Sequence, residues 1–135
     1  MIRVMLIDDH PVVRAGLRTI LDAFPDISVV AEEADGEAAL SATREEVDVV
    51  VCDIQMPGMD GITATRRLRA ADGPPVLILT TYDTQADIVA AVEAGALGYL
   101  LKDAPEQALH DAVVATAAGR RTLAPEVADA LAERM

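Results

Sequence analysis

The sequence has very few aromatic residues and a single cysteine. Of its 135 residues, two are Tyr, one is Phe and none is Trp, so we expect a core of Val, Ile, Leu and Ala. Cys52 is the only cysteine, which excludes a disulfide within the chain and fits a reducing cytoplasm. No apolar run approaches the roughly 18 residues of a membrane span, and the N-terminus does not have the pattern of a signal peptide. We therefore expect a cytoplasmic globular protein that does not enter a membrane.

Positive charge is also scarce. The chain has 23 acidic and 11 basic residues, for a net charge of −12. Affinity for nucleic acid rests on Lys and Arg side chains that neutralise phosphates, so we do not expect this chain to bind DNA by itself. Lysine occurs once, as Lys102, at the end of an apolar segment, and this position favours a specific role.

Five apolar segments of strand length alternate with segments of helical periodicity. The predicted strands are 2–7, 27–32, 47–52, 76–80 and 97–101. They are apolar on both faces and rich in Val, Ile and Leu, as is typical of a parallel sheet covered by helices on both sides. A helix is predicted after each strand, which makes a (βα)₅ pattern.

The predicted helices differ in the strength of their apolar stripes. The third is expected from about Gly61 to Ala71 with Asp60 as its N-cap, and Pro105 is expected near the first position of the fifth. The stripe of the first helix and the weaker stripe of the second are, in order, Val13, Leu17, Ile20 and Phe24, and Leu40, Thr43 and Val47.

This alternation predicts an α/β protein with a flavodoxin-like, doubly wound parallel sheet in the strand order 2-1-3-4-5. In that order, ligands bind beyond the carboxyl ends of the first and third strands. Neither GxGxxG nor GxxxxGK[ST] follows the first strand, which disfavours a dinucleotide or P-loop site. The pattern is complete by residue 119, so we expect one domain over 1–119 and an appended polar connection and helix over 120–135.

Polar residues end four of the predicted strands. Asp8 and Asp9 follow the first, Asp53 the third and Lys102 the fifth, while Thr80 ends the fourth. Parallel strands place these ends at one edge of the sheet. Two carboxylates about 4 Å apart repel by roughly 4 kcal/mol at an effective dielectric of 20, so the cluster favours a bound cation, and its all-oxygen ligands suit Mg²⁺. A hydroxyl and an ammonium nearby are what a bound phosphoryl group needs.

Each of these residues alone also has a purely structural interpretation. A single Asp at this position often caps the next helix, Thr80 is an ordinary strand residue, and Lys102 could be a surface lysine with a buried stem. Their occurrence together at one edge favours the functional interpretation.

Four segments carry a resemblance to a known family. They are IDDHPVVRAGL (7–17), VCDIQMPGMDG (51–61), ILTTYD (78–83) and AGALGYLLKDA (94–104). Through residues 1 to about 120 the chain resembles the receiver domain (CheY-like) of two-component response regulators, and more narrowly the NarL/FixJ class with LuxR-type output. The resemblance implies that Asp53 is the phosphoacceptor.

The resemblance also implies a metal site and a switch. Asp8, Asp9 and Asp53 would hold Mg²⁺ with the backbone carbonyl of Gln55; Asp9 would be the more direct ligand of the acidic pair, and Asp8 would act mainly through water. In a second group, Thr80 would hydrogen-bond the phosphoryl group, Lys102 would pair with it, and Tyr99 would be the aromatic rotamer switch. The chain departs from many receivers at Asp103, where proline is common after the lysine, and Gln55 and Tyr82 stand where the family varies.

The function implied is that of a signalling switch rather than of an enzyme, apart from self-promoted phosphoryl transfer and hydrolysis. A sensor histidine kinase would be the donor, and phosphorylation would alter the surface of residues 84–119 and favour a homodimer. Residues 120–135 resemble the linker before a helix-turn-helix domain that does not follow here, so DNA would be reached only through that absent domain.

Three other interpretations remain open. A phosphatase with an aspartyl-phosphate intermediate, similar to the haloacid dehalogenases, would place its nucleophile in a DxD after the first strand, whereas Asp8 and Asp9 are adjacent. A flavodoxin-like cofactor binder would need aromatic residues that are scarce. A degenerate receiver that only docks would keep the fold without the switch.

Overall fold

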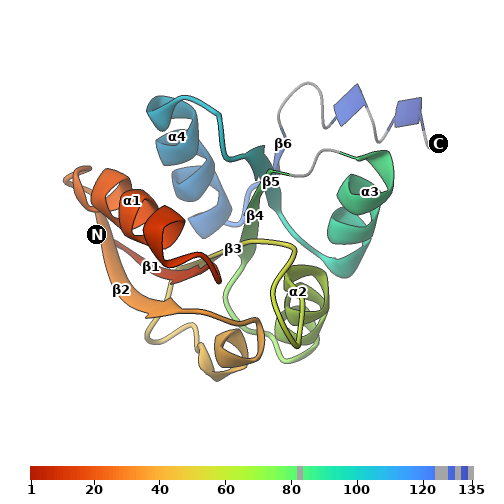
Figure 1. Ribbon diagram of the computed structural model, residues 1–135, viewed down its shortest axis with the longest axis horizontal. Helices are drawn as coiled ribbons and strands as arrows, with labels where there is room; N and C mark the ends of the chain where they lie inside the picture. The colour runs from red at the N-terminus through yellow and green to blue at the C-terminus, as the bar shows by residue number, and fades with distance from the viewer. Residues whose placement is uncertain (82–83, 124–127, 130–131, 134–135) are drawn as a thin grey trace.

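A six-stranded parallel sheet forms the centre of the molecule (Figure 1). The computed structural model describes residues 1–81, 84–123, 128–129 and 132–133. The strands lie in the order β2-β1-β3-β4-β5-β6, and every neighbouring pair is parallel. Their bounds are β1 Ile2–Ile7, β2 Ile27–Glu33, β3 Val49–Cys52, β4 Val76–Thr80, β5 Gly98–Leu101 and β6 Thr122–Leu123. The predicted flavodoxin-like fold and the order 2-1-3-4-5 are confirmed.

Helices cover both faces of the sheet. Helices α1 (Pro11–Asp22) and α4 (Glu106–Ala117) lie on one face, and η1 (Glu37–Ser41), α2 (Gly61–Ala70) and α3 (Gln85–Ala94) lie on the other (Figure 1). None of the described helices has the length and apolar composition needed to cross a bilayer.

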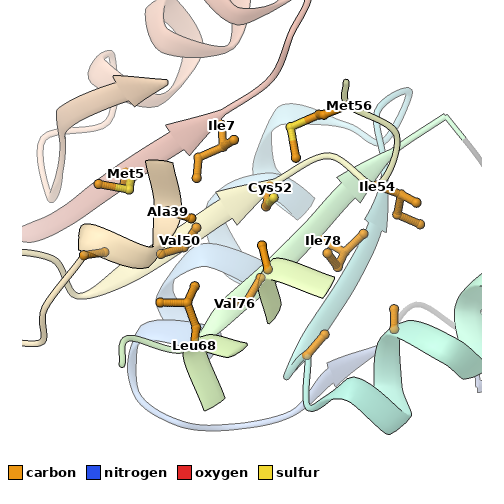
Figure 2. Packing of buried hydrophobic residues seen from close by; sticks show 14 of the residues in the cluster. Met5, Ile7, Ala39, Val50, Cys52, Ile54, Met56, Leu68, Val76 and Ile78 are labelled. Carbon is orange, nitrogen blue, oxygen red and sulfur yellow. The ribbon is translucent and has the colours of Figure 1, made fainter. Parts of the chain in front are cut away.

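The core has two halves, because successive strand residues point to opposite faces. Met5 and Ile7 of β1 pack with Val50 under η1, α2 and α3 (Figure 2). Val4 and Leu6, which alternate with them, pack against α1 and α4. With both faces buried, the strands must be apolar throughout.

The second predicted helix is wrong. The structure has only the five-residue 3₁₀ segment η1 there, so the described residues form four α-helices rather than five. The backbone becomes extended at Ala42, and the Arg3 guanidinium on β1 hydrogen-bonds the carbonyls of Arg44 and Glu45. Val47 is buried as predicted, but from a loop.

The stripe predicted for the first helix is partly wrong. Leu17 and Leu21 are the buried residues of α1, whereas Val13 is 39% exposed and Phe24 lies beyond the end of the helix. Val13 is in the first turn of α1, where that helix borders the cleft described below. Helix periodicity identifies the helix but does not predict which of its residues border the cleft.

The start of α2 follows its prediction closely. The Asp60 carboxylate accepts a hydrogen bond from the Thr63 amide at 2.7 Å, as an N-cap does. The next residue, Gly61, donates its amide to the Ile54 carbonyl at 2.7 Å. A Cβ at Gly61 would collide with the main-chain carbonyl of Asp53, so only glycine lets α2 begin this close to β3.

The segment after residue 119 contains a strand that was not predicted. Thr122 and Leu123 pair with Gly98 and Tyr99 of β5, where a polar connection was expected. The helix predicted from Pro125 falls largely outside the described residues.

Candidate functional site

The carboxyl ends of β1, β3 and β5 bring three predicted residues into contact. The Lys102 ammonium donates to Asp8 Oδ2 at 2.6 Å and to Asp53 Oδ2 at 2.9 Å. Asp8 and Asp53 are only 1% and 6% exposed, and the Lys102 side chain is 13% exposed. One ammonium therefore bridges two buried carboxylates that are 45 residues apart in the chain.

The second oxygen of each carboxylate is held by backbone next to it. Asp8 Oδ1 accepts the His10 amide at 2.8 Å, and Asp53 Oδ1 accepts the Ile54 amide at 2.7 Å. Both side chains are thus fixed by local turn geometry on one side and by Lys102 on the other. The arrangement is preorganised before any ligand enters.

Lys102 is expected to stay charged in this setting. Burial of its ammonium by itself would lower the pKa, but hydrogen bonds and charge attraction from Asp8 and Asp53 outweigh burial and hold the pKa of Lys102 above its ordinary value. The cluster of Asp8, Asp9, Asp53 and Lys102 therefore has three acidic groups and one fixed cation. Because the acidic groups outnumber the ammonium, the cluster favours the binding of a further cation.

Asp9 supplies a test of whether a metal ion fits. Its Oδ1 atom is buried and accepts no hydrogen bond from the described residues, although His10 Nδ1 lies 3.0 Å away in a poor direction. A buried carboxylate oxygen without a donor is costly unless a cation compensates it. Ligand atoms of Asp8, Asp9, His10 and Asp53 all lie within 4.8 Å of one another. The carboxylate oxygens of Asp8, Asp9 and Asp53 fit a hard divalent cation such as Mg²⁺.

The cluster opens onto a cleft of about 740 Å³. Its lining includes Asp9, Asp53 and Lys102 from the cluster, together with Gln55, whose placement agrees with its predicted position beside the site. Gln55 is exposed. The cleft allows a ligand to approach Asp53 from solvent.

Thr80 and Tyr99 lie apart from this opening. Both are fully buried, Tyr99 within the core under α3, and neither is among the residues that line the cleft. The neighbouring Thr81 is exposed and does line it. The main-chain amide of Lys102 donates to the Thr80 carbonyl at 2.9 Å, so Thr80 flanks the site through its backbone.

The remaining features noted in the sequence are the bond before Asp103 and the variable position Tyr82. The peptide bond between Lys102 and Asp103 is trans, like every other peptide bond among the described residues. Tyr82, which stands where the family varies, lies outside the described residues.

Two residues at the site were not predicted. His10 is the N-cap of α1, and its amide fixes Asp8. Arg14, one turn into α1, donates from its guanidinium to the main-chain carbonyl of Asp8. The only sequence signal for Arg14 is its spacing of four residues from His10. This spacing places Arg14 on the same face of α1 as the N-cap residue.

Cys52 lies beside the site without taking part in it. The thiol is fully buried, and desolvation, reinforced by the negative charges of Asp53 and Asp8, raises the pKa of Cys52 far above its ordinary value. A thiol held neutral in this way is a poor nucleophile.

Comparison with known proteins gives a consistent picture. Residues 4–114 match the model of the response regulator receiver domain. The chain is 41% identical over 137 residues to the transcriptional regulatory protein LiaR of Bacillus subtilis (strain 168), covering 100% of this chain and 65% of the relative. It is also 41% identical over 135 residues to the nitrate/nitrite response regulator protein NarP of Escherichia coli (strain K12), covering 98% of this chain and 62% of NarP.

Solved structures agree with these relatives. A crystal structure of the response regulator ChrA in a heme-sensing two-component system has 75% identity and a TM-score of 0.85, covering 99% of this chain and 65% of that one. The signal receiver domain of the putative response regulator NarL from Mycobacterium tuberculosis has 37% identity and a TM-score of 0.83, covering 88% and 98%. The chain thus spans just under two thirds of the length of LiaR, NarP and the ChrA chain.

Proposed function

The chain belongs to the response regulator receiver domain family, in its NarL/LuxR-type branch, and from this premise we propose that Asp53 accepts a phosphoryl group from a sensor histidine kinase. The observation that carries the proposal is the bridge from Lys102 to Asp8 and Asp53, of which Lys102 and Asp53 line the cleft. It keeps the Asp53 carboxylate oriented, accessible and next to a fixed cation, as an acceptor for phosphate requires.

The proposed reaction is a displacement at phosphorus. A carboxylate oxygen of Asp53 attacks the phosphorus of the kinase phosphohistidine, an O–P bond forms, and the P–N bond breaks as the imidazole takes up a proton. Charge grows on the phosphoryl oxygens, and Lys102, 2.9 Å from Asp53, is placed to stabilise it. Transfer and later hydrolysis at Asp53 would be the only chemistry of the chain, which is a signalling module rather than a conventional enzyme.

Asp8, Asp9 and Asp53, with the main-chain carbonyl of Gln55, are the residues proposed to hold Mg²⁺. When bound, the ion would neutralise charge on the phosphoryl oxygens. The buried Oδ1 atom of Asp9, which accepts no hydrogen bond from the described residues, supports this assignment. The chain itself orients the carboxylates through backbone amides and keeps Lys102 protonated.

The output of the proposed switch runs through buried residues. Phosphorylation adds roughly −1.5 to −2 charges, and Thr80 would move toward the phosphoryl group while Tyr99 repositions. Both lie on strands next to α3, so the surface of α3, β5 and α4 would change. We propose that this change favours a homodimer and controls a DNA-binding domain attached beyond residues 120–135, with residues 1–119 as the receiver. The relatives named as transcriptional regulators, which are longer than this chain, support such an output.

Phosphoryl transfer to Asp53→Asn tests the proposal. Wild-type protein with Mg²⁺ and acetyl phosphate should gain the mass of one phosphoryl group, and Asp53→Asn should gain none. Asp72→Asn, an exposed acid on another part of the surface, is the matched control and should behave as wild type. Labelling of the Asp53→Asn variant would refute the assignment. Because ChrA belongs to a heme-sensing system, its class of kinase is the first protein donor to test.

A further inference from the structure

Arg14 connects three parts of the molecule beside the acidic pair. It sits in the first turns of α1, and its Nη1 donates to the main-chain carbonyl of Asp8 at the end of β1. Its Nε lies 3.5 Å from Oε1 of Glu32 on β2. The side chain is only 21% exposed, so the contact is partly shielded from water and salt.

This contact controls the peptide between the two aspartates. The Asp8 carbonyl belongs to the planar unit that continues into Asp9, so a donor on that oxygen restrains the direction in which Asp9 leaves the strand. On its other side, the Asp8 amide donates to the Glu33 carbonyl at 3.1 Å. The peptide units on both sides of Asp8 are therefore held.

Asp9 depends on this backbone restraint more than Asp8 does. The Asp8 carboxylate is held directly by the His10 amide and by Lys102. The Oδ1 atom of Asp9 has no hydrogen-bond donor among the described residues. The His10 ring lies 3.0 Å from this oxygen but is itself largely exposed. The position of Asp9 near the other carboxylates therefore depends mainly on its main chain, which Arg14 restrains through the Asp8 carbonyl.

We propose that Arg14 is a positioning residue that sets the affinity of the acidic site for a divalent cation by fixing the Asp8–Asp9 peptide. The identity of the ion rests on the proposed function. Groups that orient metal ligands without touching the metal commonly change metal affinity by 10- to 100-fold when they are removed. Because Arg14 acts on one of several ligands, we expect an effect at the lower end, about tenfold.

Charge and position make opposite predictions for Arg14. A fixed cation near an acidic site repels an incoming cation, so loss of the charge alone would tighten Mg²⁺ binding. Loss of the restraint on Asp9 would weaken it. The direction of the change therefore separates the two roles.

Arg18 provides a matched control. It lies on the same helix one turn further on, and its guanidinium also pairs with Glu32, but it donates to Asp22 rather than to Asp8. Arg and Met have similar helix propensities, so Arg14→Met and Arg18→Met remove the same charge with the same small effect on α1.

The experiment is a Mg²⁺ titration of wild type, Arg14→Met, Arg14→Lys and Arg18→Met by calorimetry, with Mn²⁺ binding followed by electron paramagnetic resonance. Arg14→Met should bind about tenfold more weakly than wild type, Arg18→Met equally or more tightly, and Arg14→Lys, which keeps one donor, in between. If Arg14→Met binds as tightly as Arg18→Met, or Arg14→Lys is as weak as Arg14→Met, the proposal is overturned. Arg14→Gln takes the place of Arg14→Met, under the same criterion, if circular dichroism shows Arg14→Met to be unfolded.

A second readout needs no metal. In metal-free protein, the ¹³C resonance of the Asp8 carbonyl and the ¹⁵N resonance of the Asp9 amide should shift in Arg14→Met and stay unchanged in Arg18→Met. Unshifted resonances in Arg14→Met would show that the contact is absent in solution and overturn the inference. If instead wild type binds no divalent cation while the shifts appear, the metal assignment of the proposed function fails and the positioning contact stands.

Discussion

Replacement of Lys102 by Met is the most informative perturbation of the cluster. The change removes the ammonium that bridges Asp8 and Asp53 while keeping an unbranched side chain of similar length. At an effective dielectric of 20, contacts of 2.6 and 2.9 Å correspond to gross attractions of about 6 kcal/mol each. Much of this is offset by the cost of desolvating the ammonium.

The net effect can be bounded from measured cases. Removing one partner of a buried ion pair typically costs about 3–5 kcal/mol, since the other charge is left uncompensated. Because the cleft lets water reach the carboxylates, we expect about 3 kcal/mol for metal-free protein. For a chain of this size that corresponds to a fall in Tm of roughly 10 °C. Saturating Mg²⁺ should reduce the difference, because a divalent cation replaces the missing charge.

The assay is thermal unfolding by circular dichroism, in chelator and in Mg²⁺. Arg66→Met is the control, since Arg66 is exposed on α2 and has no ion pair with the described part of the chain. The folded-state pKa of Lys102 is raised, so its contribution should be complete below the ordinary lysine value of 10.5 and be lost only as the pH rises through the higher folded-state value. A Lys102→Met protein as stable as Arg66→Met in chelator would refute this account of the cluster.

Two other predictions concern the space around two glycines and an ion pair at the surface. Gly61→Ala should unfold at much lower urea concentration than wild type, because the added Cβ would collide with the Asp53 carbonyl. Gly16→Ala on α1, where nothing lies within 4 Å of the added Cβ, should instead stabilise the protein by about 0.5–1 kcal/mol. Equal urea midpoints for the two variants would contradict this difference in space. His110 Nε2 lies 2.8 Å from Asp26 Oδ2, and hydrogen bonds to its acidic partners raise the pKa of His110 above 6.5. His110→Gln should therefore lower the free energy of unfolding in urea more at pH 6 than at pH 9. The protonated imidazole is fully stabilised by its partners below pH 6.5, and this stabilisation is lost as the pH rises through the folded-state pKa. The same loss at both pH values would show that the ion pair does not form.

The central cluster could be predicted from sequence because parallel strands align their carboxyl ends. Once the strands ending near Asp8, Asp53 and Lys102 were assigned, their proximity followed from topology without knowledge of any side-chain contact. The burial of Thr80 and Tyr99 away from the cleft did not follow, because strand alternation alone does not specify where the cleft opens.

The features that sequence reasoning missed depend on contacts between distant segments. The carbonyls of Arg44 and Glu45 accept hydrogen bonds from the Arg3 guanidinium, more than 40 residues away. No local sequence pattern predicts these contacts. Arg14 is similar, since it contacts the site through the main-chain oxygen of Asp8 rather than through a complementary side chain. Side-chain to backbone bonds leave almost no trace in residue composition.

The short strand β6 changes how the switch would be coupled to whatever lies beyond it. Leu123 is in register with Tyr99 on β5, so the end of β6 lies in the sheet directly beside the proposed rotamer switch. A tether attached there begins after Leu123 rather than after Gly119, and a shorter tether raises the effective concentration of its cargo near the receiver surface. Because β6 is paired with β5, any displacement of β5 would also move the residues of β6 at which that tether begins.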